Sequence, residues 1–224
     1  MSSQKWPITF PDRIQLYSLA TPNGQKISIA LEEFELPYEA HRVDIMAGDQ
    51  FLDEYKVISP NSKIPAIVDP KGSDGKKLVL MESGAILLYL AEKTGKLLPK
   101  GQAKYTHLQW LFFQVGHIGP MFGQFGHFHK YARAKCDHPY PLLRYQTETQ
   151  RLLAVLEQRL RESDFVGGSD YSIVDISIAP WVDCLGTFYE GTEILQLKNY
   201  QRVQAWLARC KSRPAYERGS QVCR

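Results

Sequence analysis

The sequence lacks the marks of several protein classes. Its four cysteines are far apart, without any Cys-x-x-Cys pair: they are Cys136, Cys184, Cys210 and Cys223. This pattern favours buried or idle thiols in a reducing compartment over a disulfide framework or a metal site. The longest apolar runs, such as residues 86–91, are much too short to span a membrane. Residues 1–11 contain no apolar stretch of the secretory kind, so we expect a cytoplasmic protein that does not bind membranes.

A large excess of charge is missing as well. The net charge of +3 and the isoelectric point of about 8.6 are too mild for a nucleic-acid-binding surface, although they allow a modest attraction for small anions. With 44% hydrophobic and 23% charged residues, the composition is that of an ordinary globular protein. We therefore expect a protein with a sizeable core and small-molecule ligands, and no nucleic-acid partner.

Short strand and helix patterns alternate over residues 12–96, which predicts one compact α/β domain after an N-terminal arm of residues 1–11. The strands are expected around Ile14 and Leu16 and over three later segments. Helices are expected after the first strand, as an irregular stretch over residues 49–58, and from an N-cap at Ser83 to a stop at Gly95. The last two strands should form an antiparallel hairpin; the three later segments are residues 38–43, 64–69 and 78–81.

The strand signal disappears after residue 102, which predicts a second, all-helical domain over residues 102–224 behind a linker at residues 97–101. Ser172 and Asp175 have the spacing of a capping box and should start one of its helices. The periodic apolar positions predict four helical stretches, over residues 102–133, 141–163, 173–187 and 199–212.

The stretch from Leu16 to Lys26 is the first candidate site. A strand ends in a turn of Thr, Pro, Asn and Gly, and a helix begins directly after it. The free N–H groups and positive dipole end of that helix suit an anion, which could be a phosphate, a carboxylate or a thiolate. None of the cysteines lies in this turn, so a thiolate would have to come from a ligand.

Two further motifs narrow the choice of ligand. Pro65 opens a hairpin strand, which fits an edge strand or a cis peptide bond, and the backbone of Ile64 would then be open to an extended peptide. Glu82 and Ser83 offer a carboxylate for an ammonium group beside a hydroxyl and an N–H for a carboxylate, the pairing that an α-amino-acid end group needs. Taken alone, the same two residues would rather be interpreted as a solvated surface carboxylate and a helix cap. A peptide with such an end group favours a thiolate over a phosphate.

Taken together, these motifs resemble those of the glutathione-transferase family. The resemblance is closest to the bacterial Nu class of this family and to the fungal relatives of that class. It covers about residues 12–215 and implies a thioredoxin-like N-terminal domain, an all-α C-terminal domain and a homodimer. The segments that carry it are residues 21–24, 59–69, 82–90, 110–123, 144–150 and 171–176.

The resemblance also implies roles for single residues in binding glutathione. Ile64, before a cis Pro65, would pair with the cysteinyl part by its backbone, and Glu82 with Ser83 would hold the γ-glutamyl end. Thr21 would face the sulfur, Arg144 would reach a carboxylate from the helical domain or across the dimer, and the remaining polar contacts would come from Asn23, Gln50 and Lys63.

The expected activity follows from the acidity of the thiol. A free thiol has a pKa of about 8.5, so hydrogen bonds from Thr21 and Asn23 and the helix start would have to favour the thiolate. Tyr17 and Ser18 compete with them for this role. The resemblance implies glutathione-dependent reduction of disulfides, with organic peroxides as further substrates. The alternative is a binding module that keeps the fold without catalysis.

Three histidines alternate with Gly, Phe and Met over residues 116–130, but they lie without a carboxylate on a glycine-rich helix, so we predict no metal site. The apolar side chains of the same segment predict a wall that faces the substrate, with core packing as the alternative. These side chains are Met121, Phe122, Phe125 and Phe128.

Overall fold

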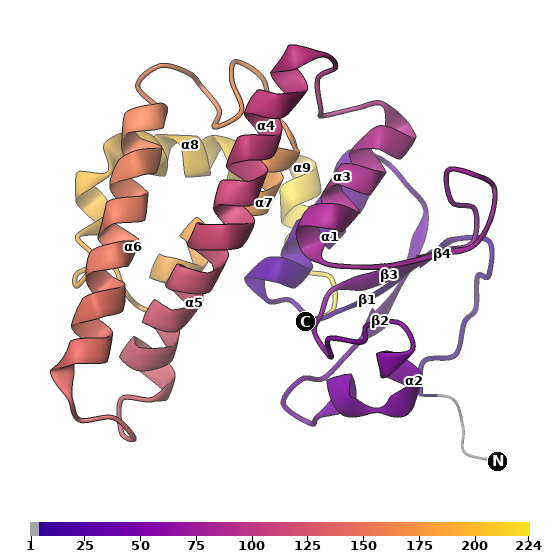
Figure 1. Ribbon diagram of the computed structural model, residues 1–224, viewed down its shortest axis with the longest axis horizontal. Coiled ribbons are helices and arrows are strands. Elements are labelled where there is room, and N and C mark those ends of the chain that lie inside the picture. Colours follow the sequence, from indigo (N-terminus) through magenta and orange to yellow (C-terminus); the bar gives the residue numbers. More distant parts are fainter. Residues whose placement is uncertain (1–4) are drawn as a thin grey trace. The chain divides into compact units, whose positions relative to one another are not determined.

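The structure is a computed structural model that describes residues 5–224 (Figure 1). It divides into two compact units: residues 5–96 together with Pro214–Arg224 form the N-terminal unit, and Leu97–Arg213 form the helical unit. The division falls between Lys96 and Leu97; the role of residues 97–101 as a linker stays a prediction. The part of the predicted arm before residue 5 lies outside the described residues.

A four-stranded mixed sheet in the order β2-β1-β3-β4 forms the centre of the N-terminal unit. β1 pairs with β2 in parallel and with β3 in antiparallel orientation, and β3 and β4 form the predicted antiparallel hairpin. The third strand begins at Ala66, two residues later than its pattern indicated. The strands are β1 (Ile14–Ser18), β2 (Tyr38–Arg42), β3 (Ala66–Asp69) and β4 (Leu78–Met81).

Helices cover the two faces of this sheet. α1 (Pro22–Glu33) and α3 (Ser83–Thr94) lie on one side, and α2 (Asp53–Lys56) lies on the other, after a short 3-10 turn at Asp49–Phe51 (Figure 1). α3 ends at the left-handed Gly95, as predicted. Its start differs by one residue, because Glu82 occupies the N-cap position and Ser83 is already helical.

The C-terminal helix α9 (Pro214–Ser220) belongs to the N-terminal unit, whereas its residues fell within the predicted domain of residues 102–224 and no helix was predicted for them. It packs closely along α1: a Cβ atom at Gly219 would lie 2.5 Å from the Cα of Ile29. Ser28 Oγ donates a hydrogen bond of 2.7 Å to the carbonyl of Gly219, and Arg218 pairs with Glu32 at 2.6 Å. Only glycine, which has no Cβ atom, permits this approach, so Gly219 allows α9 to pack against α1.

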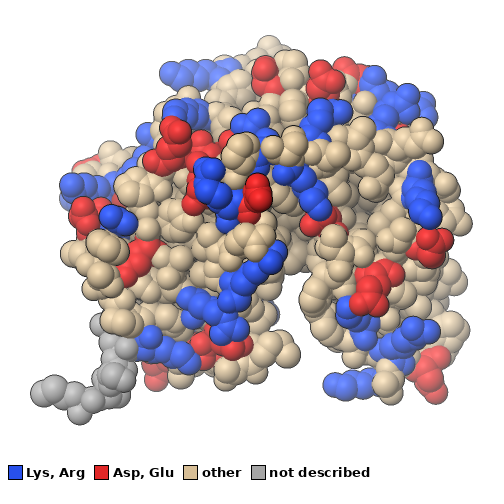
Figure 2. All heavy atoms as spheres, turned by 180° about the vertical axis from the view of Figure 1, so that it is seen from behind, with Lys and Arg blue, Asp and Glu red and all other residues tan. Residues whose placement is uncertain are grey.

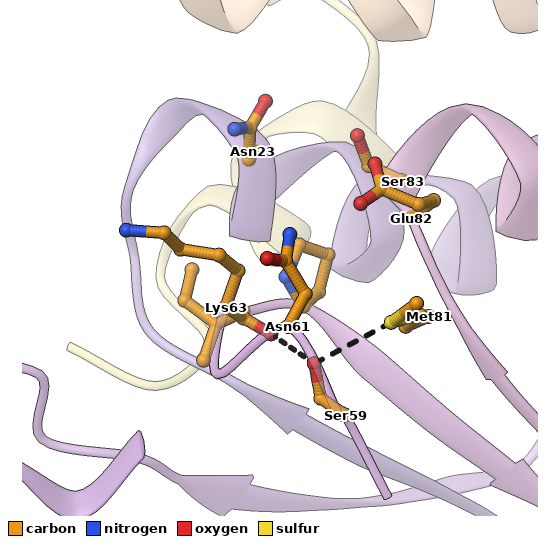
Figure 3. A pocket seen from close by; sticks show the side chains of 9 residues that line it. Asn23, Ser59, Asn61, Lys63, Met81, Glu82 and Ser83 are labelled. Atoms are coloured by element: carbon orange, nitrogen blue, oxygen red, sulfur yellow. Dashed lines mark hydrogen bonds between the residues drawn. The ribbon is translucent and has the colours of Figure 1, made fainter. Parts of the chain in front are cut away.

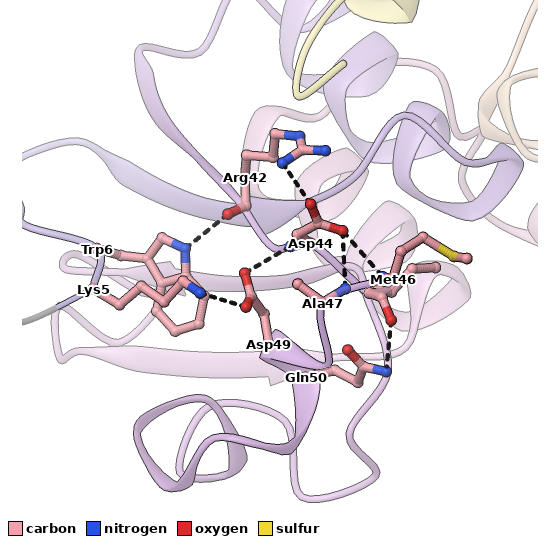
Figure 4. A network of polar contacts seen from close by, with 9 residues as sticks. Lys5, Trp6, Arg42, Asp44, Met46, Ala47, Asp49 and Gln50 are labelled. Atoms are coloured by element: carbon pink, nitrogen blue, oxygen red, sulfur yellow. Dashed lines mark hydrogen bonds and ion pairs between the residues drawn. The ribbon is translucent and has the colours of Figure 1, made fainter.

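The segment before β1 is anchored in the same unit (Figure 4). Trp6 is buried, and its indole N–H donates a hydrogen bond of 2.8 Å to the carbonyl of Arg42. Its ring packs with Tyr17 and Tyr55 in a small aromatic core. The neighbouring Lys5 forms an ion pair with Asp49. The predicted arm is therefore anchored to the packed structure at Trp6, whereas residues 7–11 are exposed.

The helical unit contains the predicted helices with small changes. The pattern over residues 102–133 corresponds to α4 and α5, each followed by a π-helical turn, at Gln114–Ile118 and His127–Tyr131. Among residues 5–224, no helix is both long and apolar enough to cross a membrane. The helices are α4 (Gln102–Phe113), α5 (Gly119–Gly126), α6 (Pro139–Arg159), α7 (Ile173–Thr187) and α8 (Gln201–Lys211).

The core of the helical unit includes side chains that the sequence favoured as a substrate wall. Phe122 and Phe125 are fully buried, so they belong to the core and cannot face a ligand. Phe128 is partly buried and stacks on Tyr145, with 5.5 Å between the ring centroids. Charged side chains of both signs alternate over the face of the molecule shown in Figure 2, in keeping with the small net charge.

Candidate functional site

A polar cavity of about 280 Å³ lies in the N-terminal unit (Figure 3). The start of α1, the loop before β3 and the junction of β4 with α3 each contribute to its wall. The cavity thus brings together the three stretches that the sequence singled out. The lining residues are Asn23, Ser59, Asn61, Lys63, Ile64, Pro65, Met81, Glu82 and Ser83.

The loop before β3 is held by hydrogen bonds to a single carbonyl. Tyr55 Oη and Ser59 Oγ each donate a hydrogen bond of 2.8 Å to the carbonyl of Lys63. The peptide bond between Ile64 and Pro65 is cis, as expected, and strand pairing begins only at Ala66. The backbone of Ile64 therefore lies at the cavity wall, outside the pairing registers of the sheet.

The start of α1 contributes a hydroxyl and an amide. Thr21 is the N-cap residue, and its Oγ1 accepts a hydrogen bond of 3.3 Å from the N–H of Gly24. This bond occupies an acceptor site and leaves the hydroxyl proton of Thr21 available to another partner. The turn needs glycine at position 24, because a Cβ atom there would lie 1.9 Å from the carbonyl oxygen of Leu19. Asn23 lines the cavity, whereas Thr21 is not among its lining residues.

The start of α3 contributes groups of opposite character. Glu82 is exposed and has a φ of +70°, a left-handed conformation that is uncommon for a non-glycine residue and costs of the order of 1 kcal/mol or more. Ser83, the next residue, is 8% exposed. Its Oγ lies 3.2 Å from Nζ of Lys26, a lysine of α1 that is buried beneath it. An acceptor for an ammonium group and a hydroxyl for a carboxylate therefore stand side by side.

Comparison with known proteins identifies the family. The family model described as "Glutathione S-transferase, N-terminal domain" matches residues 20–93, and "Glutathione S-transferase, C-terminal domain" matches residues 141–214. The disulfide-bond oxidoreductase YfcG of Escherichia coli K12 is 50% identical over 204 residues, which are 90% of this chain and 92% of that protein. The chain belongs to the glutathione S-transferase family.

Solved structures of this family have the same fold. A glutathione transferase family member from Pseudomonas fluorescens with two glutathione bound superposes with a TM-score of 0.96, at 50% identity over 98% of this chain and 97% of that one. A glutathione transferase from Pseudomonas putida with one glutathione disulfide bound per subunit gives 0.94, at 48% identity over 97% and 94%. The predicted resemblance and the predicted fold, a thioredoxin-like domain with an all-α domain, are thereby confirmed.

Three of the residues expected at the glutathione site are not among the residues that line this cavity. Thr21 lies beside Asn23 at the start of α1, as described above. Gln50 belongs to the 3-10 turn, where its Nε2 donates a hydrogen bond of 3.2 Å to the carbonyl of Ile45 and its Oε1 is buried without a partner among the described residues (Figure 4). Arg144 belongs to α6 of the helical unit, where it is exposed and lies 3.8 Å from Glu148. The other members of the expected set line the cavity.

The two residues that competed with Thr21 are buried. Tyr17 is 4% exposed and stacks on His41, with 4.7 Å between the ring centroids. Burial raises the pKa of its hydroxyl, assisted by the charges of Glu39 and Glu54. Ser18 is 2% exposed, and its Oγ is turned to the carbonyl of Leu19 at 3.4 Å. Both competing side chains are thus buried, whereas Thr21 and Asn23 are partly exposed.

Sequence reasoning missed four residues of the site. Ser59, Asn61 and Met81 lie within or directly beside the motifs that carried the resemblance, and this adjacency was the available signal. Lys26 ends the first candidate stretch, but no role was expected for its side chain, because its contact with Ser83 spans 57 residues of sequence. The described part of the chain holds no group of three His, Cys, Asp or Glu side chains that could bind a metal ion.

Proposed function

We propose that this chain binds glutathione in the cavity of its N-terminal unit and uses it to reduce disulfides. The observation that carries the proposal is the convergence of the Ile64 backbone, the Glu82–Ser83 pair and Asn23 on one cavity. Such a cavity matches a tripeptide with an amino-acid end group. The 50% identity to a disulfide-bond oxidoreductase supports the reaction type.

Each group of the cavity has a distinct role in binding. Glu82 accepts hydrogen bonds from the α-ammonium of the γ-glutamyl end, and Ser83 donates its hydroxyl and N–H to the neighbouring carboxylate. Ile64 pairs with the cysteinyl backbone as a short added strand. Lys63 lines the cavity and contributes a positive charge toward the second carboxylate of the ligand. Gln50 and Arg144 are proposed to add polar contacts from outside this cavity.

Thr21 and Asn23 hold the sulfur as a thiolate. A thiol with a pKa of about 8.5 is mostly protonated at neutral pH, and lowering that pKa by one unit takes about 1.4 kcal/mol of preferential interaction with the thiolate. A hydroxyl donor, an amide donor and the start of α1 together supply one to two such units. The protein needs no cysteine of its own at this place, and none of its four cysteines lines the cavity.

The bound thiolate supplies the nucleophile for thiol–disulfide exchange. Its sulfur attacks one sulfur of the substrate disulfide, the S–S bond breaks, and the leaving thiolate takes a proton from water. A second glutathione then opens the mixed disulfide, which yields glutathione disulfide and the second thiol of the substrate. Two glutathione molecules are thereby oxidised and one disulfide is reduced.

Glutathione-dependent reduction of hydroxyethyl disulfide by the purified protein tests this proposal. We expect a rate well above the uncatalysed exchange and a strong loss in Glu82→Gln, while Glu54→Gln, an exposed carboxylate of α2 outside the cavity, should retain the activity. Cumene hydroperoxide in the same assay tests the predicted peroxide reduction. A rate at the background level with all disulfides would overturn the proposed reaction, and retention on glutathione resin would then favour a non-catalytic binding module.

We also propose a homodimer in the cytoplasm. Dimers are the assembly that the family resemblance implies, and the helical unit carries exposed apolar side chains such as Tyr105 and Phe112 on α4. All four cysteines are free thiols, which suits a reducing compartment. Sedimentation equilibrium tests the assembly, and a monomer at micromolar concentration would contradict it.

A further inference from the structure

Lys26 is a buried cation that the proposed reaction does not use. It belongs to α1, its side chain is 1% exposed, and its Nζ lies 3.2 Å from Ser83 Oγ. Lysine is rarely buried to this extent, because removing an ammonium group from water is costly. The residue that it contacts lines the cavity, so the cation lies directly behind a ligand-binding hydroxyl.

Burial, and not the neighbouring charges, weakens the hold of Lys26 on its proton. Burial lowers the pKa of Lys26 to about 7, and the negative charge of Glu82 at the start of α3 partly opposes this effect. Two further charged groups on the elements packed against α1 have ion-pair partners of their own. Lys93 of α3 pairs with Asp69 of β3, and Arg218 of α9 pairs with Glu32 on α1 itself.

The chemistry of the contact links the charge of Lys26 to the direction of the Ser83 hydroxyl. A lysine ammonium has three donors and no acceptor, so it can only donate to Ser83 Oγ. The hydroxyl proton of Ser83 is then available to the cavity. A neutral amine has a lone pair that accepts this proton instead, which turns the hydroxyl away from the cavity and removes a donor from it.

We propose that Lys26 is a positioning residue whose ammonium group directs the Ser83 hydroxyl toward a ligand carboxylate, so that ligand binding to the neutral form takes up a proton. This inference rests on the proposed function, since the carboxylate is that of the γ-glutamyl end. Below pH 7 the lysine is protonated before the ligand arrives. Above pH 7 the proton comes from solvent as the ligand binds, and the apparent affinity falls by up to about tenfold per pH unit.

S-methylglutathione is a suitable probe, because it keeps the carboxylates and the ammonium of glutathione and has no titrating thiol. Its binding to the full chain is measured by isothermal titration calorimetry between pH 6.0 and 8.5, in buffers of different ionisation enthalpy. We expect little proton uptake at pH 6.0 and uptake approaching one proton per site at pH 8. Binding with a flat Kd and no proton uptake would overturn the inference alone, whereas no binding at any pH would overturn the proposed function and this inference with it.

Two variants separate a positioning role from a merely structural one. Lys26→Met should bind the probe with a pH-independent and weaker Kd, and should raise the KM for glutathione about tenfold while kcat at saturation changes less than threefold. Ser83→Ala should flatten the pH profile as well, because Lys26 acts through the hydroxyl. Lys77→Met, an exposed lysine of the turn before β4, should retain the wild-type profile.

The pH dependence of the Kd for S-methylglutathione decides between the two roles. If folded Lys26→Met or Ser83→Ala kept the wild-type pH dependence of this Kd, the inference would be overturned. If circular dichroism shows that a variant is unfolded, the proton uptake of the wild-type protein decides by itself.

Discussion

Two helices of this protein start with a serine and a carboxylate, and they use these groups in opposite ways. α7 in the helical unit starts with Ser172 and Asp175, and α3 in the N-terminal unit starts with Glu82 and Ser83. At the start of α7, Ser172 and Asp175 form hydrogen bonds within the protein. At α3 the carboxylate and the serine line a cavity.

The start of α7 is a closed network. Asp175 is fully buried, and its oxygens accept hydrogen bonds from the Ser172 N–H and hydroxyl, from the Val166 N–H and from the Trp206 indole, all between 2.9 and 3.1 Å. Burial raises the pKa of Asp175, although these hydrogen bonds oppose the shift. This carboxylate serves the fold, since its acceptor sites are taken by the protein itself.

The start of α3 is open by comparison. Glu82 adopts a left-handed backbone conformation without a side-chain cap bond, and Ser83 meets a lysine instead of a carboxylate. The same residue types thus stabilise one helix start and leave ligand-binding groups at the other. Which role they take depends on whether the protein satisfies their hydrogen bonds internally.

The largest effect on the free energy of unfolding is expected at the start of α7. Asp175→Ala leaves buried N–H donors of Ser172, Val166 and Trp206 without an acceptor, which should lower the free energy of unfolding by about 3–4 kcal/mol. Urea denaturation of the variant beside Asp170→Ala, an exposed carboxylate five residues earlier, measures the loss. A loss below about 1 kcal/mol would remove the distinction between the two helix starts.

At the start of α3, a substitution should weaken glutathione binding and leave the stability of the fold almost unchanged. Glu82→Gln keeps the shape of the side chain but loses its charge, so the free energy of unfolding should change by less than about 0.5 kcal/mol. The Kd for glutathione should rise by about 10- to 100-fold, equivalent to about 1.5–3 kcal/mol. Titration calorimetry on Glu82→Gln and Glu54→Gln measures the Kd for glutathione, and denaturation of the same variants measures the free energy of unfolding. Equal affinities in the two variants would contradict the assignment of Glu82 to the glutathione site.

A smaller effect concerns the pH dependence of stability near neutrality, since the partner of Ser83 is the buried Lys26, whereas the partner of Ser172 is the carboxylate of Asp175. The pKa of Lys26 is about 7 in the folded protein and 10.5 as the unperturbed value, so between these values the unfolded chain binds more protons. The free energy of unfolding therefore rises with pH in this window. Relative to Lys26→Met, the wild type should gain about 1.5 kcal/mol between pH 7.0 and 8.5 in urea denaturation. A difference that stays constant across this range would be inconsistent with a neutral buried lysine.

The smallest effect is expected at a third helix start, where Thr21 both caps α1 and is proposed to face the sulfur. Thr21→Val removes the cap bond and should cost about 1 kcal/mol of stability. It should lower kcat for hydroxyethyl disulfide by about tenfold with a smaller change in KM, because the hydrogen bond strengthens as the thiolate forms. Thr21→Ser restores the hydroxyl and should restore the rate. A silent Thr21→Val with a slow Tyr17→Phe would transfer the role to Tyr17.

Local patterns were sufficient to predict most of the elements. The period of apolar residues located the β3–β4 hairpin, the capping box placed the start of α7 at Ile173, and Gly95 ended α3 where it was expected. These features depend on neighbours in sequence, and so their physics can be read from a short window. The residues left an edge strand and a cis peptide bond open at Pro65, and the resemblance to a family added the choice of the cis bond.

Features that depend on distant contacts were not accessible in this way. α9 continues the helical part of the chain in sequence, and only the close approach of Gly219 to Ile29 attaches it to the N-terminal unit. Phe122 and Phe125 have the composition of a substrate wall, yet their burial assigns them to the core. Composition does not specify which face of a helix is covered when both faces are apolar.

Short-range sequence patterns determined the succession of strands and helices along the chain and the start of α7. They also placed polar groups at the starts of α1 and α3, since backbone propensity and capping act within a few residues. The contact between Lys26 and Ser83 does not follow from such patterns, because it arises only when α1 and α3 pack together and exclude water from the lysine. Burial by that packing, and no property of lysine in the sequence, makes its charge sensitive to pH near neutrality.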